Sequence, residues 1–170
     1  MNRYLLSILS IAITLMGITT TAQASPNIPK TKSQPQLIAM SAMNSLEQSV
    51  FDRINQYRQS LNLPALSIDP IVAAQARAHS QEMAKTGNFK HRIESSAQKL
   101  AYPIAAENIA TSRGYRQPDL IAVQDWITSP KHHRNAVGRY NLTGIGVAQN
   151  AKGEYYFTQI FIYRTHLRSF

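Results

Sequence analysis

The amino-acid sequence predicts an α+β domain, because its hydrophobic pattern changes character along the chain. Apolar residues recur at helical spacing from Leu46 onward. The last part turns to β-branched and aromatic runs, TGIGVA and YYFTQIFIY, which the turn-forming segment QNAKGE separates. Several helices followed by strands are typical of the α+β class.

The N-terminal segment has the features of a secretory signal peptide. Arg3 precedes a nearly unbroken apolar run from Leu5 to Met16, and Ala22-Gln23-Ala24 matches the small-x-small cleavage pattern. The run is short for a membrane span, which needs about 20 apolar residues. We therefore expect cleavage after Ala24, export to the periplasm or the extracellular space, and no transmembrane segment in the remaining chain.

The next residues predict a flexible linker. Residues 25–44 contain three prolines, many polar side chains and no strong periodicity. We expect order to begin near Asn44, a single domain over residues 45–164, and a short tail over residues 165–170.

Two helices are predicted at the start of the domain. Asn44 is placed to cap the first, with Glu47 three positions later, and one apolar stripe follows. The stripe consists of Leu46, Val50, Ile54, Tyr57 and Leu61. The pair Asp69-Pro70 is a strong start signal for the second helix, and Gly87 is a good C-terminal cap. The alanines of this second helix allow neighbouring elements to approach closely.

The middle of the chain predicts an irregular segment and two shorter helices. Residues 88–117 show no clear pattern, apart from a short apolar piece around residues 105–110. Pro118 begins a third helix, in which Trp126 is expected to anchor the core. Ser129-Pro130 opens a fourth helix that ends near Gly138, with Ser129 as its cap.

Two antiparallel strands are predicted at the C-terminal end. The second, YYFTQIFIY, is apolar at positions of both parities, which indicates a central strand. Gly144 and Gly146 in the first strand are better explained by close packing than by a phosphate-binding loop.

Composition excludes several kinds of chemistry. The chain contains no cysteine, so it has no disulfide, no thiolate ligand and no cysteine nucleophile, which favours a bacterial exported protein. The formal net charge is +9, but no run of five like charges exists, and no specific nucleic-acid partner is expected. An exported protein of this charge can still lie against anionic envelope material.

Histidines and one carboxylate are the remaining chemical groups. His91 follows a helix cap, and Glu107 lies among small apolar residues, where burial requires a partner. The two together suit either a zinc or proton-transfer site or a structural hydrogen bond. His79 is expected to be a packing or hydrogen-bonding residue, and His166 to be solvated in the tail. The HExxH, GxSxG, P-loop and dinucleotide-binding signatures are absent.

Taken in order, these pieces resemble the CAP superfamily, which includes the cysteine-rich secretory proteins, antigen 5 and pathogenesis-related 1. The matching segments span about residues 46–163 and read INQYRQSLNLPAL, AAQARAHSQEMA, NFKH, AENIA, W..SPKH..N, GIGVA and YYFTQIF. The absence of cysteine resembles the short bacterial branch. The resemblance implies a three-layer α-β-α sandwich with a central, mostly antiparallel sheet.

The resemblance also implies a cleft that binds a divalent metal in some members. His91 and Glu107 match the first histidine and the glutamate of that cleft, and His132 matches the second histidine. A second glutamate would fall near Ser129 and is missing, and His133 replaces the usual arginine. The implied set is therefore His91, Glu107 and His132, with zinc or another divalent cation as the possible cofactor. Because adjacent helical residues point about 100° apart, His133 is expected to face partner groups or solvent.

The candidate residues and the family resemblance are compatible with three functions. The first is non-catalytic binding of a lipid, an envelope polymer or a protein, for which Ile104, Ile109 and Ile121 are candidate groove residues. The second is a metal-assisted hydrolase, a peptidase or phosphodiesterase, in which Glu107 is a base or a ligand. The third is a structural envelope protein. Binding is favoured, because the resemblance implies no settled enzymatic activity.

Overall fold

The computed structural model describes residues 43–92 and 104–165. All of them belong to one compact unit, Lys32–Phe170. The predicted signal peptide, most of the predicted linker and His166 in the tail lie outside the described residues. Within the described residues, no helix is both long enough and apolar enough to cross a membrane.

The described chain forms four helices and four strands. In chain order they are α2 (Ser45–Ser60), β1 (Ser67–Ile68), α3 (Pro70–Thr86), β2 (Ile104–Arg113), α5 (Pro118–Thr128), α6 (Pro130–Ala136), β3 (Leu142–Gln149) and β4 (Glu154–Tyr163). The four helices confirm the four that the sequence predicts.

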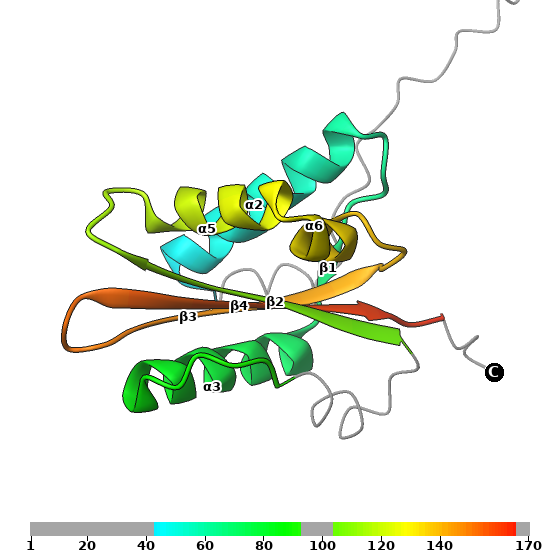
Figure 1. The fold of residues 1–170 in the computed structure, drawn as a ribbon. Coiled ribbons are helices and arrows are strands. Elements are labelled where there is room, and N and C mark those ends of the chain that lie inside the picture. Colours follow the sequence, from blue (N-terminus) through cyan, green and yellow to red (C-terminus); the bar gives the residue numbers. More distant parts are fainter. Residues whose placement is uncertain (1–42, 93–103, 166–170) are drawn as a thin grey trace, which may run out of the picture. The chain divides into compact units, whose positions relative to one another are not determined.

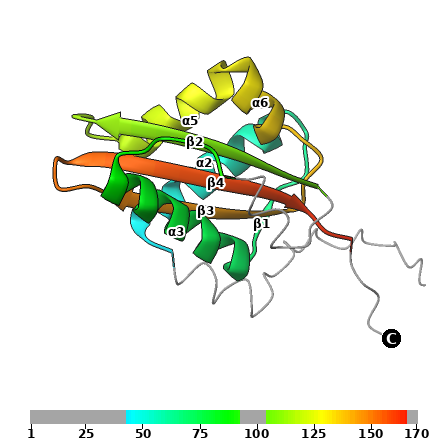
Figure 2. The same cartoon turned by 60° about the horizontal axis from the view of Figure 1, so that its bottom comes forward.

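The strands form one sheet with the order β1-β3-β4-β2. The pairs β3–β4 and β4–β2 are antiparallel, and the short β1 pairs with β3 in parallel. Helix α3 covers one face, and α2, α5 and α6 cover the other (Figures 1 and 2). The predicted α-β-α sandwich is therefore confirmed, and β4 is central as expected.

The predicted starts of the first two helices are both made by side chains. The Asn44 side chain accepts a hydrogen bond from the backbone N–H of Glu47, whose carboxylate accepts one from the Asn44 N–H. Asp69 caps α3 through the N–H groups of Ile71 and Val72, and Gly87 ends that helix with a left-handed φ of 70°. These local signals could be identified in the sequence because each involves neighbouring residues only.

The prediction of an irregular segment over residues 88–117 is wrong for its second half. Ile104 to Arg113 form a ten-residue strand that pairs along its whole length with β4. Its central residues, AAENIA, include three alanines, a glutamate and an asparagine, all of which are depleted in strands, so its intrinsic strand signal is weak. Pairing with the strongly apolar β4 overrides that weak local preference. The two-residue strand β1 was also not predicted.

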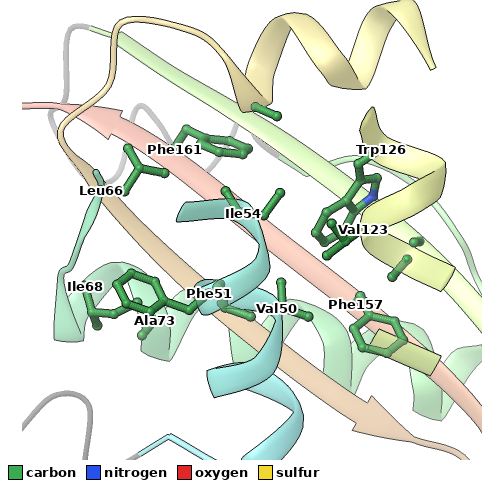
Figure 3. Packing of buried hydrophobic residues seen from close by; sticks show 14 residues of the cluster. Val50, Phe51, Ile54, Leu66, Ile68, Ala73, Val123, Trp126, Phe157 and Phe161 are labelled. Carbon is green, nitrogen blue, oxygen red and sulfur yellow. The ribbon is translucent and has the colours of Figure 1, made fainter. Parts of the chain in front are cut away.

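The larger core lies between the sheet and the layer of α2, α5 and α6. Trp126 is fully buried, as predicted, and its ring N–H donates to the carbonyl of Ile109 at 3.0 Å. Figure 3 shows Trp126 and Val123 on one side of this core, with Ile54 beside them over the strand that carries Phe157 and Phe161. This packing fixes α5, and with it the start of α6, against the sheet.

On the other face, α3 approaches β3 very closely. A Cβ atom on Gly144 would overlap backbone atoms of Val72, and one on Gly146 would overlap backbone atoms of Ala76. The two glycines therefore serve close helix-to-sheet packing, which confirms the prediction for the GIG segment.

Replacing Gly146 with alanine should push α3 away from the sheet. We expect Gly146→Ala to lower the free energy of unfolding by about 1–3 kcal/mol, as overpacked cores do, measured by urea denaturation. Gly114→Ala is the control, because Gly114 has a φ of 81° but open space around its Cβ position. It should cost about 1 kcal/mol from backbone strain alone. Equal stability of Gly146→Ala and wild type would contradict the packing role.

Candidate functional site

The candidate site lies at β2, the edge strand of the sheet. Glu107 is only 4% exposed, and its two carboxylate oxygens face the layer of α3. One oxygen accepts from His79 Nδ1 at 3.1 Å and the other from His91 Nδ1 at 2.9 Å. The backbone N–H of Arg92 also donates to the second oxygen at 2.9 Å. The buried carboxylate therefore has the partners that its burial requires.

Residue His79 is the member of this cluster that the sequence did not assign to the site. It lies on α3 and is 3% exposed. The predicted hydrogen-bonding role is confirmed, but its partner, Glu107, was not foreseen. A signal existed, because His79 shares the buried face of α3 with Ala76 and Met83. A histidine on an apolar stripe needs a buried partner, and Glu107 is a carboxylate among apolar residues that can accept more than one hydrogen bond.

The hydrogen bonds keep Glu107 ionised. Burial by itself raises the pKa of Glu107, but the hydrogen bonds from His79, the Arg92 backbone and His91 outweigh it, so its pKa lies below the ordinary value. An ionised carboxylate only accepts hydrogen bonds, so both histidines carry the proton on Nδ1. The Nε2 atom of each ring is then the nitrogen that does not contact Glu107.

His132 approaches the ring of His91 from the helical layer on the other face of the sheet. It lies on α6, and its ring centre is 6.2 Å from that of His91. Burial lowers the pKa of His132, and positive charge on His91 and Lys131 lowers it further against a smaller opposing effect of Asp125. His132 is thus held as neutral imidazole at neutral pH, the form that binds metals.

Two asparagines hold α6 against the edge of β2. The Asn108 side chain donates to the carbonyl of His132 at 3.1 Å, and the Asn135 side chain donates to the carbonyl of Glu107 at 3.1 Å. Asn135 also donates to the Asn108 side-chain oxygen at 2.9 Å. Asn108 lies in the matching segment AENIA and Asn135 in W..SPKH..N, but no sequence pattern assigns them a role.

A buried arginine fixes the far end of α6. Arg58 is 1% exposed and donates to the backbone carbonyls of Pro64, Ala136 and Gly138. Burial lowers its pKa from the ordinary value. Three carbonyl acceptors compensate part of the lost hydration, and the arrangement joins the end of α2 to the end of α6.

The neighbouring His133 points elsewhere. Its Nε2 is 3.0 Å from the Tyr57 hydroxyl, and the two rings meet edge to face. His133 therefore contacts a partner group on α2, as the 100° separation predicted. Ser129 occupies the cap position of α6, but its side chain makes no capping hydrogen bond, so only part of that prediction holds.

Of the predicted groove residues, Ile109 is buried in the core with Met83 and Tyr156, and Ile121 lines an open hollow beside α5. The side chain of Ile104 is outside the described part of the chain. Over residues 43–92 and 104–165, no three histidine, cysteine, aspartate or glutamate side chains are grouped as a metal site. The assignment of His91, Glu107 and His132 as three metal ligands stays a prediction.

Comparison with known proteins identifies the family. The model of the cysteine-rich secretory protein family, abbreviated CAP, matches residues 51–161, which includes His79, His91, Glu107 and His132. The chain belongs to the CAP family. It is 32% identical over 132 residues to the uncharacterised protein YkwD of Bacillus subtilis, which covers 73% of this chain and 49% of YkwD. The CAP chain thus spans about half the length of that relative.

Solved structures agree with the fold. An extracellular protein of Bacillus anthracis that contains an SCP domain is 29% identical, with a TM-score of 0.59 over 71% of this chain and 41% of its own. An outer surface protein of Borrelia burgdorferi has a TM-score of 0.64 at 17% identity, over 72% of this chain and 95% of its own. These relatives are described as extracellular or outer-surface proteins.

Replacing the buried carboxylate with an amide should destabilise the CAP domain in a pH-dependent way. Because the folded-state pKa of Glu107 lies below its ordinary value of 4.5, its ionised form stabilises the fold above that pH. That contribution is lost as pH falls through the folded-state pKa. We expect Glu107→Gln to cost about 2–4 kcal/mol at pH 7, from urea denaturation, and the gap to wild type to shrink on acidification.

Asp52→Asn is the matched control, because Asp52 is exposed and accepts one hydrogen bond from Gln48. It should change stability by less than about 0.5 kcal/mol at either pH. A gap between wild type and Glu107→Gln that stays constant as the pH falls would contradict the ionised state of Glu107.

Proposed function

We propose that this CAP protein is an exported, non-catalytic binding protein whose cleft holds a divalent metal between His91 and His132. The observation that carries the proposal is the approach of these two imidazoles from opposite layers, with His91 oriented by Glu107. The partner class is a lipid, an envelope polymer or a protein. The extracellular and outer-surface descriptions of relatives support export, as does the expected signal peptide.

The donor set suits zinc or a similar divalent ion. Two neutral imidazole nitrogens are common ligands of such ions, and a carboxylate on the other ring nitrogen raises ligand basicity and fixes the ring. In this proposal Glu107 orients His91 and His79 by accepting their Nδ1 protons. The remaining coordination positions are then available to water or to a group of the partner.

Binding is favoured over hydrolysis because of the state of Glu107. A general base needs a pKa near the working pH and an open lone pair facing the water it activates. Glu107 has a lowered pKa and accepts three hydrogen bonds from protein groups. The metal-assisted hydrolase therefore remains the second hypothesis, with no observation that favours it.

Calorimetry with zinc tests the metal site. We expect saturable binding to the chain from Ser25 onward, about 100-fold weaker binding or none in His91→Ala and His132→Ala, and about 10–100-fold weaker binding in Glu107→Gln. His133→Ala is the matched control, because His133 faces Tyr57 instead of His91. It should bind zinc within about twofold of wild type. Unchanged zinc affinity in His91→Ala and His132→Ala would overturn the site.

Binding to envelope material tests the function itself. The zinc-loaded chain should bind saturably to at least one fraction of a bacterial envelope extract, separated into lipid, polymer and protein. The His132→Ala variant should bind that fraction more weakly, because it lacks the metal. No binding to any fraction would contradict the proposal. Hydrolysis of a peptide or phosphodiester that chelator and His91→Ala both abolish would replace it with the hydrolase.

A further inference from the structure

An open hollow of about 620 Å³ lies where β2 leads into α5, away from the histidine cluster along the strand. It is lined by Tyr115, Arg116, Gln117, Leu120 and Ile121. Tyr115 is 57% exposed, and Leu120 and Ile121 are half-buried. The other exposed large hydrophobic residues among those described, Leu61, Ile71 and Phe89, do not line this hollow. The lining of the hollow is therefore mixed, with one aromatic and two aliphatic side chains beside an arginine and a glutamine.

Exposed cations lie at the same end of the sheet as this hollow. Arg113 and Arg116 flank Tyr115 in the sequence, and both are exposed. Arg113 pairs with Glu154 in the β2–β4 register, which places the loop beside the β3–β4 turn and its exposed Lys152 (Figures 1 and 2). Within the part of the chain that the structure describes, none of the three cationic side chains forms an ion pair.

The acidic groups nearest to this end are already engaged. Asp119, in the first turn of α5, is buried and accepts hydrogen bonds from Ser49 and Arg53. The carboxylate of Glu154 accepts from the Tyr156 hydroxyl and the Asn150 side chain. Neither carboxylate forms an ion pair with the three cations, and Asp119 is paired with Arg53. Glu154 keeps its negative charge, so one carboxylate faces three cations and this end has an excess of positive charge.

We propose that this end of the domain docks on a membrane surface that contains anionic phospholipid headgroups. Arg113, Arg116 and Lys152 would contact the phosphates. Tyr115 would lie at headgroup depth, where an aromatic ring with a polar hydroxyl is stable, and Leu120 and Ile121 would contact the acyl boundary. A purely anionic polymer would use the cations but would gain little from the tyrosine and the two aliphatic side chains. The proposal does not depend on the histidine site or on metal.

Vesicle sedimentation tests the docking surface. The chain from Ser25 onward, which contains the whole compact unit Lys32–Phe170, is mixed with vesicles of phosphatidylglycerol and phosphatidylcholine. We expect binding to the anionic vesicles that weakens as salt rises, and little binding to pure phosphatidylcholine. The triple variant Arg113→Gln, Tyr115→Ser, Arg116→Gln should bind about thirtyfold more weakly, because each interfacial cation contributes severalfold.

The matched control changes similar residues far from the hollow in the chain, at the C-terminal end of α2 and in and after α6. Leu61→Ser, Arg134→Gln and Arg139→Gln remove two exposed arginines and one exposed apolar side chain. This variant should bind anionic vesicles within about threefold of wild type, because it loses only long-range attraction. Circular dichroism and thermal melts of both triple variants verify that they are folded.

Three outcomes would overturn the proposal. The first is equal vesicle binding by wild type and the loop variant. The second is an equal loss in both triple variants, which would indicate net charge alone. The third is undiminished binding in Tyr115→Ser together with full competition by soluble polyglutamate, which would indicate an anionic polymer as the partner.

Discussion

The buried carboxylate of Glu107 accepts three hydrogen bonds, and the arrangement of the site depends on that set of contacts. Its oxygens bond to His79 of α3, to His91 beyond the end of α3, and to the backbone at Arg92. The backbone carbonyl of the same residue accepts from Asn135 of α6. One residue on the edge strand therefore connects both helical layers of the sandwich. Without these hydrogen-bond partners, the carboxylate of Glu107 would be an unfavourable buried charge.

The position of β2 at the sheet edge makes this connection possible. A central strand has neighbours on both sides, so side chains from opposite layers cannot meet across it. Beyond the outer edge of β2, His132 from one layer and His91 from the other come within 6.2 Å, measured between ring centres. Hydrogen bonds of Asn108 and Asn135 hold α6 in position against that edge, and Arg58 holds the C-terminal end of α6. The approach of the two imidazoles is thus a product of the packing of α6.

On the other face of the sheet, the close contact between α3 and β3 positions His79 in the way that the packing of α6 positions His132. Glycine at positions 144 and 146 lets the alanine-rich side of α3 lie against the strand backbone. That approach brings His79 within hydrogen-bond distance of Glu107. The docking surface proposed at the other end of β2 uses none of these contacts. The proposed metal site and the proposed membrane-facing loop therefore lie at different points along one strand.

The sequence by itself determined the helices, the two long C-terminal strands and the reason for the GIG glycines. Each of these rests on local periodicity, on capping residues or on side-chain size, all of which act between near neighbours. The order of motifs also identified the family, and the resemblance implied His91, Glu107 and His132 as candidate site residues.

Only the tertiary structure decided the rest. The ten residues of β2 have weak strand preference of their own and become a strand because β4 offers a long apolar edge to pair with. His79 became a member of the site only when α3 and β2 were placed together, since 28 residues separate it from Glu107 in the chain. His132 and His133 were adjacent and indistinguishable as imidazoles. The packing of α6 decided that the first faces His91 and the second faces Tyr57.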